Sequence, residues 1–201
     1  GEHHGQSQRA WDLAYSIVVR MRWRMNQAAE RTGLNFSLLA TPAEGLAGRF
    51  VRMDQRLHGI IPGVTDKEYY TNSFHIPVGF DIGLADKIAK EAPFHALTNA
   101  GHITYVEIDG DPSKNVGAIE QIVRFMAGSG IGYGAINHPV DHDPVCGYTG
   151  VIDDRCPGCG RAERRRPFDR IRRITGYLVG TLERFNDAKR AEVRDRVTHA
   201  L

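Results

Sequence analysis

The sequence of 201 residues contains no apolar run near the roughly 20 residues that a membrane-spanning helix needs. Residues 1–5 also lack the apolar region of a signal peptide. Net charge is nearly absent, because 26 basic residues are balanced by 24 acidic ones, so overall charge points to no class of partner. We therefore expect a cytoplasmic protein that is not attached to a membrane.

Cysteine is scarce and confined to one stretch. The three cysteines are Cys146, Cys156 and Cys159. An odd number argues against a disulfide framework, and the Cys-x-x-Cys spacing of the last two is typical of a metal site in a reducing compartment. The sequence also begins without a methionine, and a periodic helical pattern starts almost at once. This suggests the C-terminal portion of a longer protein.

Apolar periodicity predicts helices that alternate with short strands. Helices are expected over residues 7–31, 46–57, 81–92 and 115–126, with Pro93 ending the third. Strands are expected over residues 35–40, 103–108 and 131–137. This alternation favours parallel β/α units. We predict that residues 1–138 form part of an α/β sheet or barrel, and that residues 139–201 form a second module ending in a helix over residues 182–199.

The residues between the first predicted strand and the next helix have the pattern of a capping box. Thr41 would be the N-cap, Pro42 and Ala43 would open the helix, and Glu44 would stand at the third helical position. A helix N-terminus that follows a strand exposes free N–H groups and suits a phosphate. A well-capped helix without any ligand explains the same pattern. Residues 69–77 leave a similar choice, because their polar and aromatic side chains suit either a substrate cleft or a self-packed loop.

The cysteine stretch predicts a structural metal site. Cys156-Pro157-Gly158-Cys159 has the spacing of a zinc knuckle, and Cys146 precedes it. Zinc requires a fourth ligand, and Asp143 stands where a second Cys-x-x-Cys would begin, with His142 and His138 close by. A carboxylate or an imidazole could complete the set, and the alternative is a knuckle that folds without metal. A closed set of ligands leaves no position for substrate, so the role is structural in either case.

A basic stretch follows the knuckle. Residues 161–173 contain seven arginines, diluted by Glu163 and Asp169. Such a run beside a zinc knuckle is compatible with a non-catalytic module that binds nucleic acid through phosphate contacts. A solvated charged face is the simpler interpretation.

Seven ordered motifs resemble the anaerobic, class III ribonucleotide reductases, which are glycyl-radical enzymes. The motifs are Asn35-Phe36-Ser37 with Thr41-Pro42-Ala43-Glu44, residues 65–75, Glu91-Ala92-Pro93-Phe94-His95, Asn99-Ala100-Gly101-His102-Ile103, Cys146-Gly147-Tyr148-Thr149-Gly150, Cys156-Pro157-Gly158-Cys159 and Arg173-Ile174-Thr175-Gly176-Tyr177. The resemblance extends almost from end to end of the chain.

The resemblance implies an α/β fold, part of a ten-stranded α/β barrel, with a C-terminal zinc-ribbon-like radical domain. Gly176 would carry a glycyl radical, installed by a separate activase that uses S-adenosylmethionine and an iron–sulfur cluster. The radical would pass to a cysteine, whose thiyl form abstracts a ribose hydrogen from a ribonucleoside triphosphate. Residues 41–44 would hold the substrate phosphates, and Asp143, Cys146, Cys156 and Cys159 would hold a structural zinc. The reductant would be formate or a thioredoxin-like protein, and the full-length protein a homodimer.

The chemistry of glycine agrees with a radical at Gly176. A Cα radical is stabilised when the flanking amide groups delocalise it, and this requires a near-planar centre that a side chain would crowd. A turn or helix-cap glycine is the ordinary explanation of a lone glycine, and here the surrounding motif decides against it. The chain departs from the family in two ways: Asp143 replaces a cysteine, and no cysteine is left for the thiyl role. We therefore expect that the chain alone does not turn over substrate.

Overall fold

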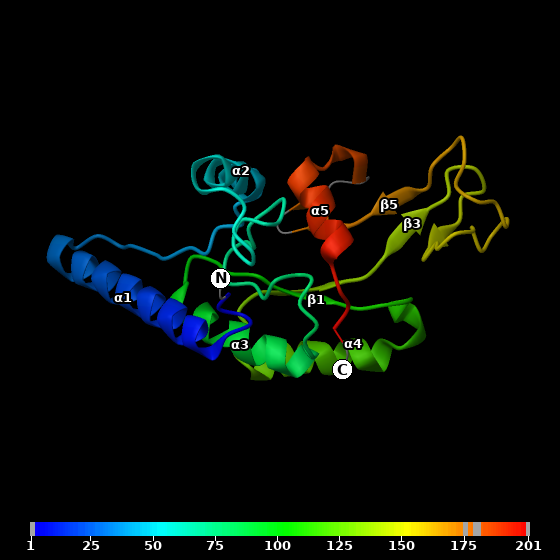
Figure 1. Ribbon diagram of the computed structural model, residues 1–201. Coiled ribbons are helices and arrows are strands. Elements are labelled where there is room, and N and C mark those ends of the chain that lie inside the picture. The colour runs from blue at the N-terminus through cyan, green and yellow to red at the C-terminus, as the bar shows by residue number, and fades with distance from the viewer. Residues whose placement is uncertain (1–2, 175–176, 179–181, 200–201) are drawn as a thin grey trace.

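The computed structural model describes residues 3–174, 177–178 and 182–199 (Figure 1). The first element is the long helix α1 (Gln8–Thr32), which Ser7 caps by accepting a hydrogen bond from the Ala10 amide at 3.4 Å. Gly33 ends the helix, so the helix predicted over residues 7–31 is confirmed. Among the described residues no helix is both long enough and apolar enough to cross a membrane.

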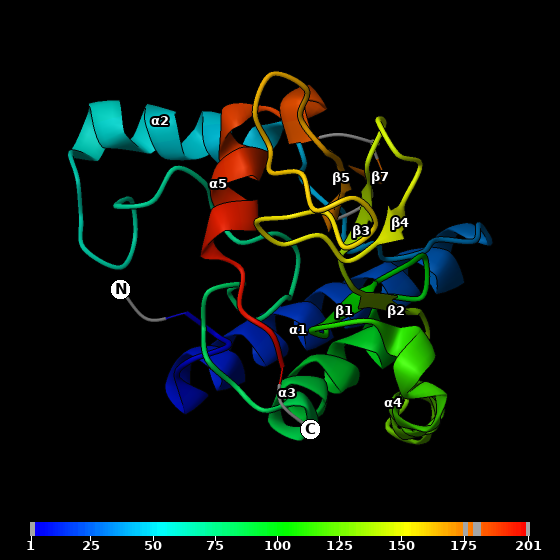
Figure 2. The same cartoon turned by 90° about the vertical axis from the view of Figure 1, so that its right-hand side faces the viewer.

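A parallel β/α unit forms the centre of the chain. It consists of α3 (Leu84–Leu97), β1 (Thr104–Glu107), a short 3-10 helix (Pro112–Lys114), α4 (Val116–Gly128) and β2 (Gly134–Asn137). β1 and β2 are parallel, with Thr104 opposite Gly134 and Glu107 opposite Asn137. In Figures 1 and 2 the helices α3 and α4 lie on the same side of these strands. The predicted parallel arrangement is confirmed for this pair.

Apolar side chains from both helices and the sheet form the main core. Ile88 of α3, Val106 of β1 and Ile122 of α4 are almost completely buried against one another. Burial of side chains of this size stabilises the fold by roughly 1.5–3 kcal/mol each. The core thus lies between α3, α4 and β1 and fixes the carboxyl ends of the two strands.

Two sequence predictions about this region are wrong. Residues 35–40 do not form a strand, because Leu39 alone makes a bridge, to Gly101. The helix predicted over residues 81–92 begins at Leu84 and continues through Pro93 to Leu97. The residue after the proline, Phe94, is fully buried and stacks on Phe74 with ring centroids 4.5 Å apart. Tertiary packing therefore outweighs the cost of a proline inside the helix.

The helix predicted over residues 46–57 is confirmed, but the capping box predicted for residues 41–44 does not start it. α2 (Leu46–His58) has Gly45 as its N-cap, with no side-chain hydrogen bond at the cap. The Ala43 carbonyl instead accepts hydrogen bonds from the amides of Leu46 and Ala47, at 3.1 and 2.8 Å. Thr41 is therefore not the N-cap, and the predicted capping box does not form. A local backbone turn has replaced it.

The residues after 139 form two small antiparallel sheets and a helix. β3 (Val140–His142) lies between β4 (Thr149–Gly150) and β5 (Asp169–Ile171). β6 (Arg173–Ile174) pairs with β7 (Tyr177–Leu178), and a short 3-10 helix (Leu182–Arg184) leads to α5 (Asp187–Asp195). The helix predicted over residues 182–199 is therefore shorter than expected. In Figure 1 the segment around β3 and β5 projects to one side of the central unit.

α5 returns to the first half of the chain. Ala188 and Ala191 pack with Ala47 of α2 and with Tyr69. The tail that follows is tied to the centre, because the His199 amide donates to the Glu107 carbonyl at 2.8 Å. The two halves of the chain thus share a packed contact, and the division at residue 138 stays a prediction.

Candidate functional site

The three cysteines and Asp143 come together at the end of the projecting segment. One ligand atom from each of the four residues lies within 4.8 Å of all the others. Asp143 Oδ2 is 3.4 Å from Cys146 Sγ and 3.3 Å from Cys159 Sγ, and the sulfurs of Cys146 and Cys156 are 3.5 Å apart. All three cysteines are free thiols. The four residues that the sequence placed at a metal site are therefore adjacent in space.

Two similar backbone turns position these ligands. In the first, the Gly147 amide donates to the Asp143 carbonyl at 2.8 Å, and in the second the Gly160 amide donates to the Cys156 carbonyl at 2.8 Å. Both glycines have positive φ, 79° and 74°, which the turn requires and which side chains disfavour. Asp143 is thus the first residue of one turn, as Cys156 is the first residue of the other.

The nearby histidines do not join this cluster. His142 Nδ1 lies 3.1 Å from Thr149 Oγ1, and His138 Nδ1 lies 3.0 Å from the Pro139 carbonyl. Within the described residues, the group that could hold a metal ion consists of Asp143 and the three cysteines alone. Of the ligands that the sequence left open, the geometry favours the carboxylate.

Asp143 is fully buried and paired with Arg161. Arg161 Nε donates to both carboxylate oxygens, at 2.7 and 2.8 Å. This hydrogen bonding holds the pKa of Asp143 well below its usual range, so the carboxyl group is ionised. Sequence analysis assigned Arg161 to a charged run and missed this pairing.

The motif that was predicted to carry a glycyl radical is described only on its two flanks. Gly176 and Thr175 lie outside the described residues, between the paired strands β6 and β7. On the preceding strand, Arg173 Nη2 donates to the Tyr133 hydroxyl at 3.3 Å, and the Arg173 carbonyl accepts from Arg196 Nη2 at 2.9 Å. β6 is therefore attached both to the residues before β2 and to the tail after α5.

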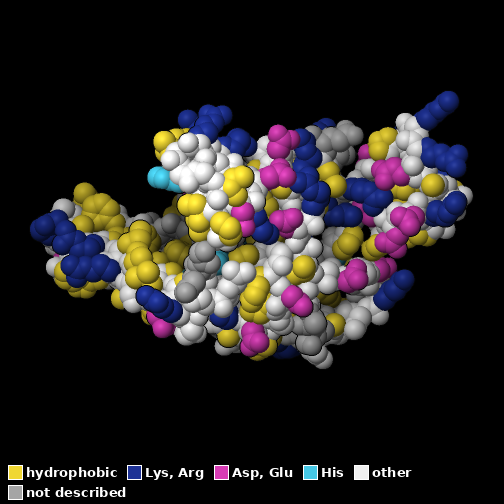
Figure 3. Space-filling model, in the orientation of Figure 1, with side chains coloured by type: hydrophobic (Ala, Val, Ile, Leu, Met, Phe, Trp, Pro, Cys, Tyr) yellow, Lys and Arg dark blue, Asp and Glu magenta, His cyan; other side chains and the backbone are white. Residues whose placement is uncertain are grey.

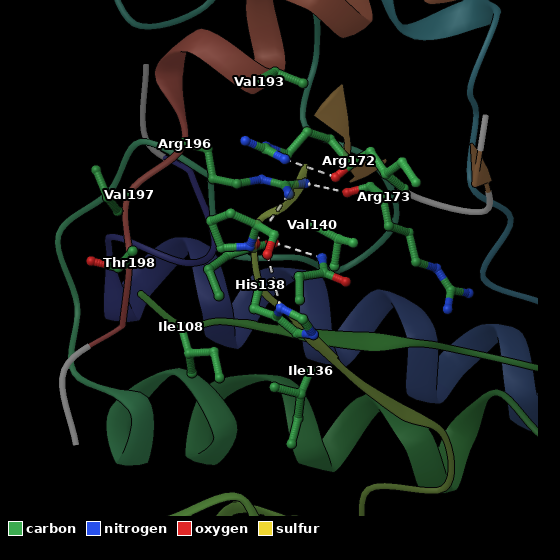
Figure 4. Close-up of a pocket in the computed structure, with 14 residues that line it drawn as sticks. Ile108, Ile136, His138, Val140, Arg172, Arg173, Val193, Arg196, Val197 and Thr198 are labelled. Atoms are coloured by element: carbon green, nitrogen blue, oxygen red, sulfur yellow. Dashed lines mark hydrogen bonds and ion pairs between the residues drawn. The ribbon is translucent and has the colours of Figure 1, made fainter. Parts of the chain in front are cut away.

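A cavity of about 360 Å³ adjoins this strand, at the carboxyl ends of β1 and β2 (Figure 4). Glu107 ends β1 and Asn137 ends β2. Glu107 accepts from Asn137 Nδ2 at 2.8 Å and pairs with Arg196 at 3.0 Å. Burial raises the pKa of Glu107 despite the nearby guanidinium group.

The rest of the cavity wall combines basic and apolar side chains. In Figure 4, Arg172 and Arg196 lie together above His138, and Ile108 and Ile136 lie below it near α4. The carboxyl ends of parallel strands are a common position for ligand sites. The cavity is therefore the strongest candidate in the described chain for part of a substrate site.

Residues 69–77 line a second, smaller cavity of about 30 Å³. Asn72 and His75 are buried there, and no hydrogen-bond partner is found in the described chain for the Asn72 amide or for either His75 nitrogen. Beside them lies the buried ion pair between Lys87 and Glu91, which the sequence analysis did not find. Phe74 of the same stretch packs on Phe94, which supports the self-packing alternative, and the substrate cleft stays a prediction.

Residues 41–44 line neither cavity. Glu44 nevertheless acts on Tyr105 of β1, which also lies near Arg173, with the guanidinium carbon 5.7 Å from the ring centroid. Burial is the main cause that raises the pKa of Tyr105 to about 12, and the Glu44 charge adds to it while Arg173 opposes it. Tyr105 thus lies near Arg173, on the strand before Gly176.

The arginines of residues 161–173 are largely used inside the protein. Arg161 pairs with Asp143, Arg170 with Glu163 and Arg172 with Asp141. The exposed remainder is the short run of residues 164–166. Figure 3 shows acidic side chains interspersed with the basic ones over this segment. This arrangement does not favour a nucleic-acid-binding module.

Residues 1–199 match the profile of a family described as anaerobic ribonucleoside-triphosphate reductase. The chain belongs to this family. It is 38% identical over 194 residues to the anaerobic ribonucleoside-triphosphate reductase of Enterobacteria phage T4, covering 94% of this chain and 32% of the relative. It is likewise 38% identical over 205 residues to the Escherichia coli K12 reductase, covering 99% of this chain and 28% of the relative. The chain thus spans about a third or less of these relatives.

Solved structures of reductases show the same fold. An anaerobic ribonucleotide reductase superimposes with a TM-score of 0.77 at 22% identity, covering 98% of this chain and 30% of that one. The Thermotoga maritima anaerobic ribonucleotide reductase with MES in its active site gives a TM-score of 0.70 at 22% identity, covering 90% of this chain and 28% of that one. These likenesses extend the resemblance from the motifs to the α/β fold.

Proposed function

We propose that the chain works in the anaerobic reduction of ribonucleoside triphosphates to deoxyribonucleoside triphosphates, where it supplies the radical glycine Gly176 and part of the substrate pocket. Family membership over residues 1–199 is the observation that carries this proposal. The paired strands on either side of residues 175–176 support it, because they attach both flanks of Gly176 to one small sheet. The radical would be installed by an activase that uses S-adenosylmethionine and an iron–sulfur cluster.

The cysteines limit what the chain does alone. Cys146, Cys156 and Cys159 are all gathered beside Asp143, so none is left as a source of the thiyl radical. The thiyl cysteine would be supplied by residues beyond this chain. The same residues would complete a ten-stranded barrel around β1 and β2, in a homodimer that uses formate or a thioredoxin-like protein as reductant.

We further propose that Asp143 and the three cysteines hold a structural zinc ion. Three thiolates and a carboxylate are ligands that zinc accepts, and the four donor atoms already lie within 4.8 Å of one another. Zinc would supply a fixed tetrahedral junction between the two turns. A closed ligand set of this kind would stabilise residues 141–160, whose Ile152 and Cys156 share a small core with Phe168.

Substrate would be held from two sides. Residues 41–44 are proposed to contact the phosphates through the turn before α2, whose Glu44 acts on Tyr105. The cavity beside β6 would contribute Arg172 and Arg196 toward anionic groups. Asp141 and Glu107 partly neutralise these basic side chains. Their main contribution would therefore be hydrogen bonds that orient a ligand, and their net charge would attract it only weakly.

Electron paramagnetic resonance tests the assignment of Gly176. Anaerobic treatment of the chain with the activase, S-adenosylmethionine and a reductant should give a doublet from the single α-hydrogen. The Gly176→Ala variant should lose this signal, whereas Gly128→Ala, at the end of α4, should keep it. A doublet that survives in Gly176→Ala would overturn the assignment.

A further inference from the structure

We infer that Arg161 is a positioning residue of the metal centre: it aims one oxygen of Asp143 at the three sulfurs and offsets part of the negative charge of the ligand set. This inference rests on the zinc site proposed above. It concerns a residue outside the ligand set, whose side chain donates to Asp143 and whose carbonyl accepts a hydrogen bond from the Cys156 amide at 2.9 Å.

The two oxygens of Asp143 have different surroundings. Oδ2 accepts a hydrogen bond from Arg161 Nε at 2.8 Å and lies 3.4 and 3.3 Å from the sulfurs of Cys146 and Cys159. Oδ1 accepts a hydrogen bond from the Val145 amide at 2.9 Å and lies 2.6 Å from Arg161 Nη2. The Val145 amide and Arg161 therefore hold the carboxylate, and Oδ2 is the oxygen that faces the sulfurs. Side chains that hold a metal ligand in this way fix its orientation and raise metal affinity.

Arg161 is itself fixed in place. Its Nη1 donates to the Arg166 carbonyl at 2.7 Å, and its guanidinium carbon lies 4.2 Å from the centroid of the Phe168 ring. Phe168 is buried with Ile152 and Cys156. The side chain of Arg161 is only 19% exposed, so it differs from a mobile surface ion pair, which contributes little. A planar guanidinium group holds this geometry better than a lysine would.

The charges also match. Three thiolates and one carboxylate carry four negative charges, and a zinc ion would leave two of them uncompensated beside the buried Asp143 and Cys156. The guanidinium group removes one of these, and uncompensated charge is costly away from water. A cysteine in place of Asp143 would have no second acceptor for Arg161 to hold. Asp143 and Arg161 thus form a matched pair, in which the arginine directly follows the second turn at Gly160.

Metal competition tests this pairing. Zinc and cobalt affinities of the reduced chain would be measured against a chromophoric chelator, without oxygen, for the parent chain and for Arg161→Gln, Arg161→Lys and Arg164→Gln. We expect Arg161→Gln to weaken binding about 10- to 100-fold, Arg161→Lys to fall between, and the exposed Arg164→Gln to match the parent. The cobalt d–d bands should shift in Arg161→Gln as the carboxylate moves, while the thiolate charge-transfer bands stay.

A double-mutant cycle separates positioning from general loss of folding. In an Asp143→Cys background there is no carboxylate for Arg161 to aim, so Arg161→Gln should change the affinity far less there than in the parent. An equal loss in both backgrounds, or no loss in the parent background, would overturn the inference. If the parent chain binds no stoichiometric zinc, the proposed metal site itself is wrong. This result differs from one in which zinc binds but Arg161→Gln has no effect, which would overturn only the role of Arg161.

Discussion

Gly48 of α2 faces Ala188 of α5 so closely that a Cβ atom on Gly48 would lie 2.4 Å from the Ala188 Cβ. This contact joins a helix from the first half of the chain to the helix near its C-terminal end. The contact adjoins Tyr69 and Ala191, and α5 leads directly into the tail that hydrogen-bonds Glu107. The absence of a side chain at Gly48 therefore allows α5 to pack closely against α2 at this point.

Replacing Gly48 by alanine should destabilise the chain. Alanine gains about 1 kcal/mol in helix propensity over glycine, but overpacking at a tight contact costs about 1–3 kcal/mol. Chemical denaturation should show a lower midpoint for Gly48→Ala and partial recovery in Gly48→Ala/Ala188→Gly. As a control, Gly128→Ala in α4 should be neutral or slightly stabilising, since a Cβ there meets nothing within 4 Å. An unchanged midpoint for Gly48→Ala would contradict the contact.

The buried pair of Lys87 and Glu91 should be costly to break. Both side chains are nearly inaccessible, and Glu91 Oε1 also accepts from the Ile76 amide at 2.8 Å. Lys87→Met removes the lysine charge from this buried carboxylate and leaves it the Ile76 amide and the His75 ring, whose Nδ1 lies 4.0 Å from Glu91 Oε2. The variant should lower the free energy of unfolding by about 3–5 kcal/mol. The matched pair Arg124 and Glu120 has the same spacing and is largely exposed. Arg124→Met should change stability by no more than about 0.5 kcal/mol; equal effects at the two sites would refute this account.

Acid should destabilise the fold through its buried histidines. Burial lowers the pKa of His102 from 6.5 to about 3 and that of His95 to about 4. Below pH 6.5 the unfolded chain binds protons that the folded chain does not, so stability is full above pH 6.5 and falls toward pH 4. Each such group contributes a slope of up to about 1.4 kcal/mol per pH unit in this window.

The variant His102→Phe isolates one of these groups. No hydrogen-bond partner is found in the described chain for either His102 nitrogen, so phenylalanine should preserve stability at pH 7. Thermal melts between pH 7 and 5 should show a shallower loss than the parent chain. His58→Gln, at the exposed end of α2, serves as the control and should leave the slope unchanged. A parent-like slope in His102→Phe would rule out this source of acid sensitivity.

Removal of zinc should loosen the cysteine segment and leave the central unit intact. Chelation of the metal would release the two turns that carry Asp143 and Cys156, while the core of α3, α4 and β1 does not depend on them. Limited trypsin digestion should then cut at Arg155 and within residues 164–166 at least tenfold faster than before chelation. Fragments from residues 84–137 should appear at the same rate in both samples. Identical cleavage of the cysteine segment would argue against a structural metal.

Sequence patterns predicted the features that depend on local spacing. The spacing of apolar residues predicted α1, the alternation of helices and strands predicted parallel strands such as β1 and β2, and the spacing of the knuckle predicted the meeting of Asp143 with the cysteines. Family motifs added the α/β fold, which the structural likenesses support. The placement of Gly176 cannot be compared, because it lies outside the described residues.

Features that depend on distant partners were predicted poorly. Residues 35–40 resemble a strand, but their pairing depends on Gly101 and on Asn99, whose side chain accepts from the Leu38 amide at 3.0 Å. The capping pattern at Thr41 was overridden by the turn at Ala43. Arg161 was counted in a charged run, because no sequence pattern shows that a guanidinium group will meet a carboxylate 18 residues earlier.

The pairing of His142 with Asp169 places the entry and exit of the cysteine segment side by side, since these residues lie opposite each other on β3 and β5. Residues 143–168 therefore form one long excursion of the chain, whose two ends are joined by the pairing of β3 and β5. A short hairpin turn could replace residues 143–168, because the connection between β3 and β5 has only a short distance to span. The proposed metal site could in this way be exchanged between related chains without moving the strands β3 and β5.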